Sequence, residues 1–205
     1  MDAQPPNPPL VVKLTPEEQA KLDAMHRNRF NNPASTKSAH VENYGPIKTL
    51  TLGSDWKDFG NQVVGGRVAW RLYKLLNPVP ATLRVYANPK PPSPETVTFL
   101  QNRTKTTPGP VPTSNWKRIK IFGTAGNPDL FKIYSIEVQD LAGKHVIVMT
   151  GQSTKADSLE KNVYVSPTGD WTKRYEFGVA ATKNNFDKAV EKFDEALKTV
   201  VWKTE

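Results

Sequence analysis

From residue 47 onward the chain repeatedly alternates apolar and polar residues with a period of two, which is the pattern of half-buried β-strands. Segments of this kind fall at residues 47–52, 67–74, 82–88, 116–123, 129–139, 144–150 and 173–182, with a short edge strand expected at 162–165. Residues 140–143, DLAG, form a typical hairpin turn between two of them. The pattern therefore predicts a mainly antiparallel sheet.

Two helices are predicted within this stretch. Ser93 is a good N-cap and Pro94 suits the first helical position, so a short helix should run to about residue 103. Near the C-terminus, apolar residues recur at helical spacing on one face, at Phe186, Val190, Phe193, Leu197 and Val200. The predicted fold class is α+β: a single mainly antiparallel sheet with an inserted short helix and a C-terminal amphipathic helix packed on it.

The first 46 residues differ in composition and are treated as a separate segment. Four prolines between residues 5 and 9 predict an extended arm. Thr15, Pro16 and Glu18 form a capping box that should begin a helix, and residues 31–46 read as a polar loop. The predicted domains are residues 1–46, a Pro-rich arm with a capped helix and a loop, and residues 47–205, the α+β domain. The arm could dock on its own domain or on a partner.

The net charge of +8 is concentrated in the middle of the chain. Residues 57–121 contain only two acidic residues, Asp58 and Glu95. They contain eleven basic residues: Lys57, Arg67, Arg71, Lys74, Arg84, Lys90, Arg103, Lys105, Lys117, Arg118 and Lys120. This local excess favours an anionic partner, which could be an acidic protein surface, nucleic acid or an anionic membrane, or it could serve solubility alone.

Basic and aromatic residues interleave on the polar sides of the predicted strands. If residues 67–74, 82–88 and 116–122 are neighbours in the sheet, one polar face collects most of them. With Lys90 just after the second strand, the predicted partner-binding residues are Arg67, Arg71, Tyr73, Arg84, Tyr86, Lys90, Trp116, Arg118 and Lys120. Such a face suits a protein interface or single-stranded nucleic acid, unless helices cover both sides of the sheet.

Residue types that support catalysis are scarce. The chain has no Cys, and its three His residues show no metal-binding spacing. Asp55 and Asp58 are close in sequence, but two acids in a turn are more often capping groups than a catalytic pair. We therefore expect a protein that is not an enzyme and that has no metal and no cofactor.

Several short segments together resemble the PsbP-like family and its structural relative, the Ran-binding nuclear import factor. The resembling residues are Asp55-Trp56, the strand 83–86 running into Pro89, the helix start Ser93-Pro94-Glu95, the strand 133–137 and the spacing of Phe186, Phe193 and Val200. The resemblance spans roughly residues 47–202. It implies a non-enzymatic accessory or assembly protein, often an exported one.

The expected function is that of an accessory or assembly subunit, which binds the acidic surface of a larger protein complex through residues 57–121. That complex could be a membrane-associated one. Single-stranded nucleic-acid binding by the sheet face is the alternative, and peripheral membrane association is also compatible with the charge. No apolar run approaches the roughly 20 residues of a membrane span. The location stays open: periplasmic or lumenal if a targeting segment was removed, otherwise cytoplasmic.

Overall fold

The computed structural model describes residues 39–90, 92–105, 108–118, 131–153 and 158–204, except the side chains of residues 117 and 118. The chain divides into two units, Met1–Ala34 and Ser35–Glu205, and the described residues belong to the second. The predicted N-terminal arm and helix lie outside the described residues.

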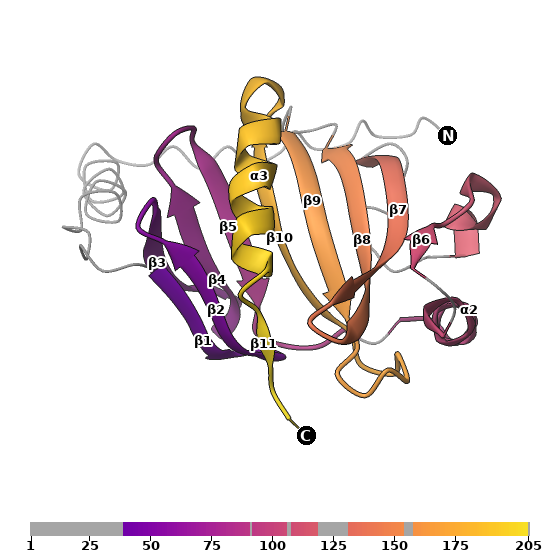
Figure 1. Cartoon of the computed structure of the whole chain (residues 1–205). Coiled ribbons are helices and arrows are strands. Elements are labelled where there is room, and N and C mark those ends of the chain that lie inside the picture. The colour runs from indigo at the N-terminus through magenta and orange to yellow at the C-terminus, as the bar shows by residue number, and fades with distance from the viewer. Residues whose placement is uncertain (1–38, 91, 106–107, 119–130, 154–157, 205) are drawn as a thin grey trace, which may run out of the picture. The chain divides into compact units, whose positions relative to one another are not determined.

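The described residues form an α+β structure dominated by antiparallel strands, but they form two sheets instead of the predicted single sheet (Figure 1). The larger sheet has eight strands in the order β3-β4-β5-β10-β9-β8-β7-β6, and the smaller has the order β1-β2-β11. The strands of the larger sheet are β3 (Trp56–Val64), β4 (Arg67–Leu75), β5 (Ala81–Tyr86), β6 (Gly109–Pro110), β7 (Phe131–Leu141), β8 (Lys144–Ser153), β9 (Ser158–Val165) and β10 (Tyr175–Thr182). Those of the smaller sheet are β1 (Ala39–Tyr44), β2 (Ile47–Gly53) and β11 (Val201–Trp202).

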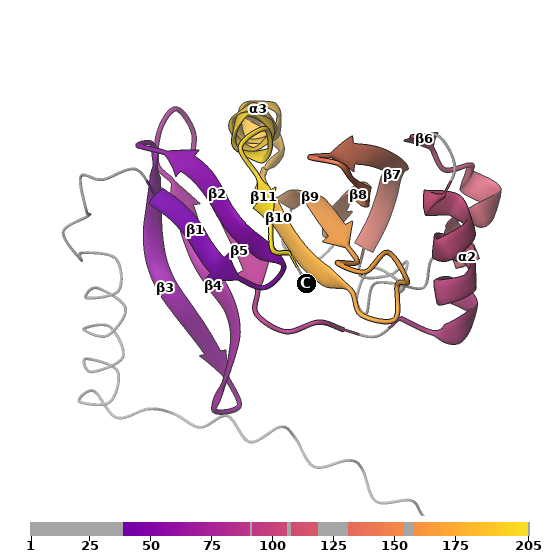
Figure 2. The same ribbon diagram turned by 60° about the horizontal axis from the view of Figure 1, so that its bottom comes forward.

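Helices pack near both faces of the larger sheet. Helix α3 (Phe186–Leu197) lies with the small sheet on one face, where it contacts β10, β9 and β2. Helix α2 (Pro94–Thr104) lies at the β7 end of the sheet, as Figure 2 shows. A short 3-10 helix, η1 (Thr113–Arg118), contacts α2, and another, η2 (Lys183–Asn185), precedes α3.

Strand β8 shows why there are two apolar cores. Val146 and Val148 belong to the core beneath α3, whereas Ile147 and Met149 belong to the core beneath α2. Since consecutive side chains of a strand point to opposite faces, β8 is buried on both sides. We call the side of the larger sheet that faces α3 its inner face and the opposite side its outer face.

The two helices predicted after residue 46 are confirmed. Ser93 caps α2, because its hydroxyl accepts a hydrogen bond from the backbone N–H of Thr96 at 3.4 Å, and Leu100 is fully buried. In α3 the apolar stripe packs as expected, with Phe193 fully buried and its ring 6.2 Å from that of Phe177 on β10. The predicted hairpin at residues 140–143 joins β7 to β8.

Three predictions of local structure are wrong. Residues 39–44, placed in a polar loop, form β1, which pairs with β2. The strand predicted at 116–123 is absent from its described part, because Trp116 lies within η1. The short edge strand predicted at 162–165 is the end of the longer strand β9, which lies between β8 and β10.

Candidate functional site

The pairing of β4 with β5 decides which side chains share a face. Trp70 lies opposite Tyr86 and Leu72 opposite Arg84, and these four side chains belong to the outer face. The alternate pairs, such as Tyr73 with Leu83, belong to the inner face, where Leu83 is fully buried. Val68, Trp70 and Leu72 alternate along β4 in the pattern of a core-facing stripe, but this side of the strand belongs to the outer face.

This register separates the predicted site residues. Tyr73 is 0% exposed and belongs to the core beneath α3, where its hydroxyl donates to the His40 carbonyl at 3.3 Å. Burial raises the pKa of that hydroxyl. Arg71 is on the same side and its Nε donates to Asp58 at 3.0 Å. The expectation that Arg71 and Tyr73 share a face with Arg84 and Tyr86 is therefore wrong.

The remaining predicted residues are also dispersed. Arg67 is exposed at the far end of β4. Trp116 packs partly buried against the core beneath α2, and its ring N–H donates to the Val111 carbonyl at 3.0 Å. The Arg118 side chain and Lys120 lie outside the described residues.

Three of the predicted residues do come together on the outer face. The ammonium nitrogen of Lys90 lies 4.7 Å from the centre of the Tyr86 ring, which is a cation–π distance. The Tyr86 ring lies 5.8 Å from that of Trp70, and Arg84 is on the same face of the same strand. We call Trp70, Leu72, Arg84, Tyr86 and Lys90 the outer-face cluster. Their side chains are partly or fully exposed, and none of the five belongs to either apolar core.

Buried polar residues of β9 and β10, and Arg174 just before β10, lie next to the outer-face cluster. Arg174 is 4% exposed, and its guanidinium lies 5.5 Å from the ring centre of Tyr164, which is 1% exposed. The Arg174 carbonyl accepts a hydrogen bond from the backbone N–H of Lys90 at 2.8 Å. The Lys90 ammonium also lies 4.0 Å from a carboxylate oxygen of Glu176. Lys90 is therefore held both by its backbone and by its charge.

Burial shifts the acid–base properties of these polar residues. It raises the pKa of the Glu176 carboxyl, although the nearby Lys90 and Arg174 charges act in the opposite direction. Burial also raises the pKa of Tyr164 and lowers that of Arg174. Each shift favours the neutral form of its group. Charges are therefore poorly solvated in the buried region that Tyr164, Arg174 and Glu176 form.

Gly178 of β10 lies between Arg84 of β5 and Asn162 of β9, and the close packing at this position requires a glycine. A Cβ at this position would lie 2.1 Å from the side-chain oxygen of Asn162 and 2.5 Å from the carbonyl of Lys161. Any other residue would therefore displace β9 from β10, which pair here.

Sequence reasoning missed Trp70, Arg174 and Glu176. Trp70 stands between Val68 and Leu72 in an apolar alternation, which is typical of the side of a strand that faces a core. Arg174 and Glu176 alternate with Tyr175 and Phe177, so the period of two in β10 did carry the signal that they share a face.

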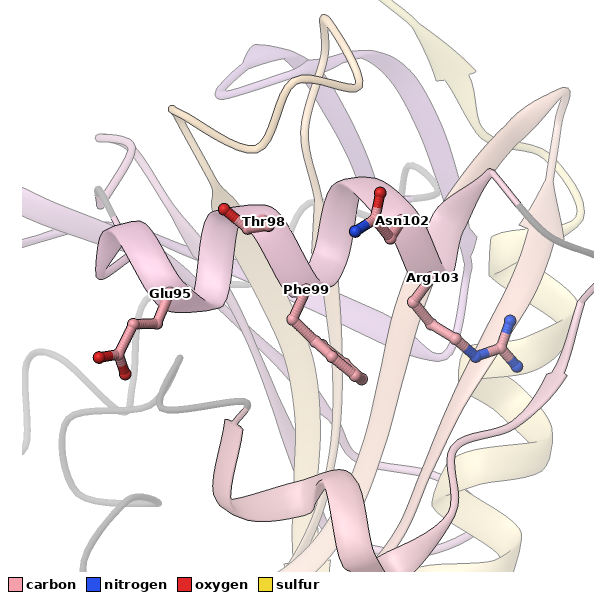
Figure 3. Close-up of a pocket in the computed structure, with 5 residues that line it drawn as sticks. All are labelled: Glu95, Thr98, Phe99, Asn102 and Arg103. Carbon is pink, nitrogen blue, oxygen red and sulfur yellow. The ribbon is translucent and has the colours of Figure 1, made fainter.

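A concave region with a volume of about 740 Å³ lies beside α2. The residues that line it come from one helix, and Figure 3 shows Glu95, Phe99 and Arg103 pointing to the same side of it. Arg103 donates to the Gly109 and Pro110 carbonyls at 2.9 and 3.2 Å, and Phe99 packs on the adjacent core. Arg103 therefore attaches residues 109–110 to α2.

Within the described ranges, no three His, Cys, Asp or Glu side chains are grouped so that they could hold a metal ion. No helix among the described residues has the length and apolar character of a membrane span. No family model matches the chain, and no curated protein shows significant similarity to it, so the resemblance to the PsbP-like family stays a prediction.

Proposed function

We propose that the protein is a non-enzymatic binding module, an accessory or assembly subunit that docks on an acidic protein surface through the outer-face cluster. One observation carries this proposal: Trp70 and Tyr86 are paired on a sheet face outside both apolar cores, with Arg84 and Lys90 beside them. Trp, Tyr and Arg are the residues that most often dominate binding energy at protein interfaces.

The support beneath the cluster favours binding through a pre-formed surface. The Tyr86 ring contacts both Trp70 and Lys90, and Lys90 is fixed through the Arg174 carbonyl. Side chains that are already held lose less conformational entropy on binding than free ones. An acidic partner would then meet two ordered aromatic rings flanked by positive charge.

The test compares two variants of the full chain. Trp70→Ser combined with Arg84→Glu should abolish co-purification with the native complex and its reconstitution from purified components. Lys188→Glu, an equal charge reversal on the exposed side of α3, should retain both. If the double variant still assembles with the affinity of the wild type, the outer-face cluster is not the docking surface.

Single-stranded nucleic acid is the second candidate, and the Trp70–Tyr86 pair with adjacent cations is the observation that favours it. Binding of a fluorescent 20-nucleotide oligo(dT) would then weaken with salt, with a log–log slope of about −2 if Lys74, Arg84 and Lys90 each contact a phosphate. An acidic protein partner predicts no measurable oligo(dT) binding at 150 mM salt. Tight oligo(dT) binding that the double variant loses would favour the nucleic-acid function instead.

A further inference from the structure

The hairpin of β3 and β4 extends beyond its neighbours in the larger sheet, as Figure 2 shows. The ladder between β4 and β5 ends at Trp70 and Tyr86, beyond which Ala87 donates to the Ala69 carbonyl at 3.2 Å and the Asn88 side chain to the Val68 carbonyl at 3.3 Å. Within the described part of the chain, no strand pairs with the end of the hairpin on the β5 side. Gly65 and Gly66 form the turn, with φ values of +57° and +75°. Such positive values are those of the tight turns that suit a twisted hairpin.

The end of this hairpin is apolar and exposed. Val63 is 61% exposed, Val64 59% and Val68 37%, and we call these three residues the valine tip. Val63 lies opposite Val68 on one face of the hairpin, whereas Val64 lies opposite Arg67 on the other. The valine tip therefore presents apolar side chains on both faces of the hairpin.

The sequence around the tip is free of negative charge. Residues 59–94 contain no Asp or Glu, and they contain five basic residues: Arg67, Arg71, Lys74, Arg84 and Lys90. Arg67 is exposed beside the valine tip, and Lys74 lies further back on β4, 4.5 Å from the ring centre of Phe59. Positive charge thus lies next to the tip and behind it along the strand.

We propose that the valine tip docks this protein on an anionic lipid surface, with Arg67 at the level of the headgroups. A protein groove would usually match one face of a hairpin, whereas the acyl region of a bilayer surrounds whatever enters it. Exposed apolar residues next to basic ones are also the combination by which interfacial segments bind anionic membranes. The backbone groups of the two-glycine turn would remain at interfacial depth, where water can still satisfy them.

The probe is a set of lipid vesicles and an environment-sensitive dye. The chain has no Cys, so Val64→Cys and Val201→Cys each give a single labelling site. Val201 is a matched control because it is a 46% exposed valine on β11. With vesicles of 70% phosphatidylcholine and 30% phosphatidylglycerol, we expect a blue shift of the dye at position 64 and none at position 201. Vesicles of phosphatidylcholine alone should give neither.

Substitutions separate apolar docking from simple charge attraction. Val63→Ser with Val64→Ser should lower the partition coefficient into anionic vesicles roughly tenfold, which corresponds to about half of the transfer free energy of each valine. Arg67→Gln should lower it about fivefold, the effect of one basic residue near such a surface. Val201→Ser and Lys188→Gln should leave it unchanged.

Three results would overturn the proposal. The first is failure of the wild-type chain to bind anionic vesicles at 100 mM salt. The second is equal binding by the wild type and the double serine variant. The third is a response of the dye at position 64 to a purified protein partner but not to vesicles, which would make the tip a protein-docking element. Because the exchanged side chains are exposed, circular dichroism should show that all variants remain folded.

Discussion

Two leucines of one strand provide a direct test of which face of β4 is buried. Leu75 is 1% exposed in the inner core, whereas Leu72 is only partly buried on the outer face and belongs to neither core. The same substitution, Leu→Ala, can be made at both positions. If the strand has the orientation described, Leu75→Ala should be the far more damaging change.

The expected free energies of unfolding follow from burial. Replacing a fully buried leucine by alanine removes its transfer free energy and leaves a cavity, which costs about 2–5 kcal/mol. Leu72→Ala creates no enclosed cavity and should cost about 1 kcal/mol or less. The difference of about 2 kcal/mol corresponds to roughly 4–8 °C in Tm for a domain of this size.

Urea unfolding followed by tryptophan fluorescence measures both values. The slopes should match that of the wild type, so that the midpoints alone report stability. Equal losses, or a greater loss for Leu72→Ala, would mean that Trp70 and Leu72 face the core and that the outer-face cluster does not exist as described.

Three further predictions concern single positions. Gly178→Ala should destabilise the protein by about 1–3 kcal/mol in urea unfolding, because its Cβ would overlap Asn162 and the Lys161 backbone; unchanged stability would contradict the close packing of β9 on β10. Ser93→Ala should cost about 1 kcal/mol through loss of the α2 cap, and Ser93→Asp should restore most of it; equal effects of the two changes would argue against a capping role. Because burial raises the native pKa of Glu176 above 4.5, the native carboxyl releases its proton at higher pH than the unfolded one, and the wild type should lose stability as pH rises through that native pKa. Glu176→Gln should therefore gain stability relative to the wild type between pH 4 and pH 7, and a relative loss over this range would show that the Lys90 and Arg174 charges outweigh burial.

Elements with local signals were predictable from the sequence. The Ser93-Pro94 start of α2, the apolar stripe of α3 and the turn at residues 140–143 each depend on residues close together in the chain. Their physical causes are a capping hydroxyl, a helical period and a tight turn, and each acts within a few residues.

Elements that depend on distant partners were not predictable. The edge strand predicted at 162–165 belongs to β9, which lies in the middle of the sheet. A lysine is accommodated in this central strand because the Lys161 ammonium contacts Asp194 of α3 at 2.7 Å. Residues 39–44 are largely polar, and only their pairing with β2 makes them a strand. The period of two in β4 identified two faces, but each carries both apolar and basic side chains: Trp70 and Leu72 with Lys74 on one, and Tyr73 and Leu75 with Arg71 on the other. The pattern therefore did not determine which face is buried.

The side chains of β4 point alternately to its two faces, and this one strand contributes to both the outer-face cluster and the valine tip. Val68 and Trp70 lie on the outer face, whereas Arg67 lies on the opposite face beside Val64. A lipid surface that receives both Val63 and Val64 must therefore meet the hairpin at its end and not on one face. A membrane-bound acidic partner could then occupy the outer face while the valine tip remains inserted, so that each surface should be removable by substitution without loss of the other.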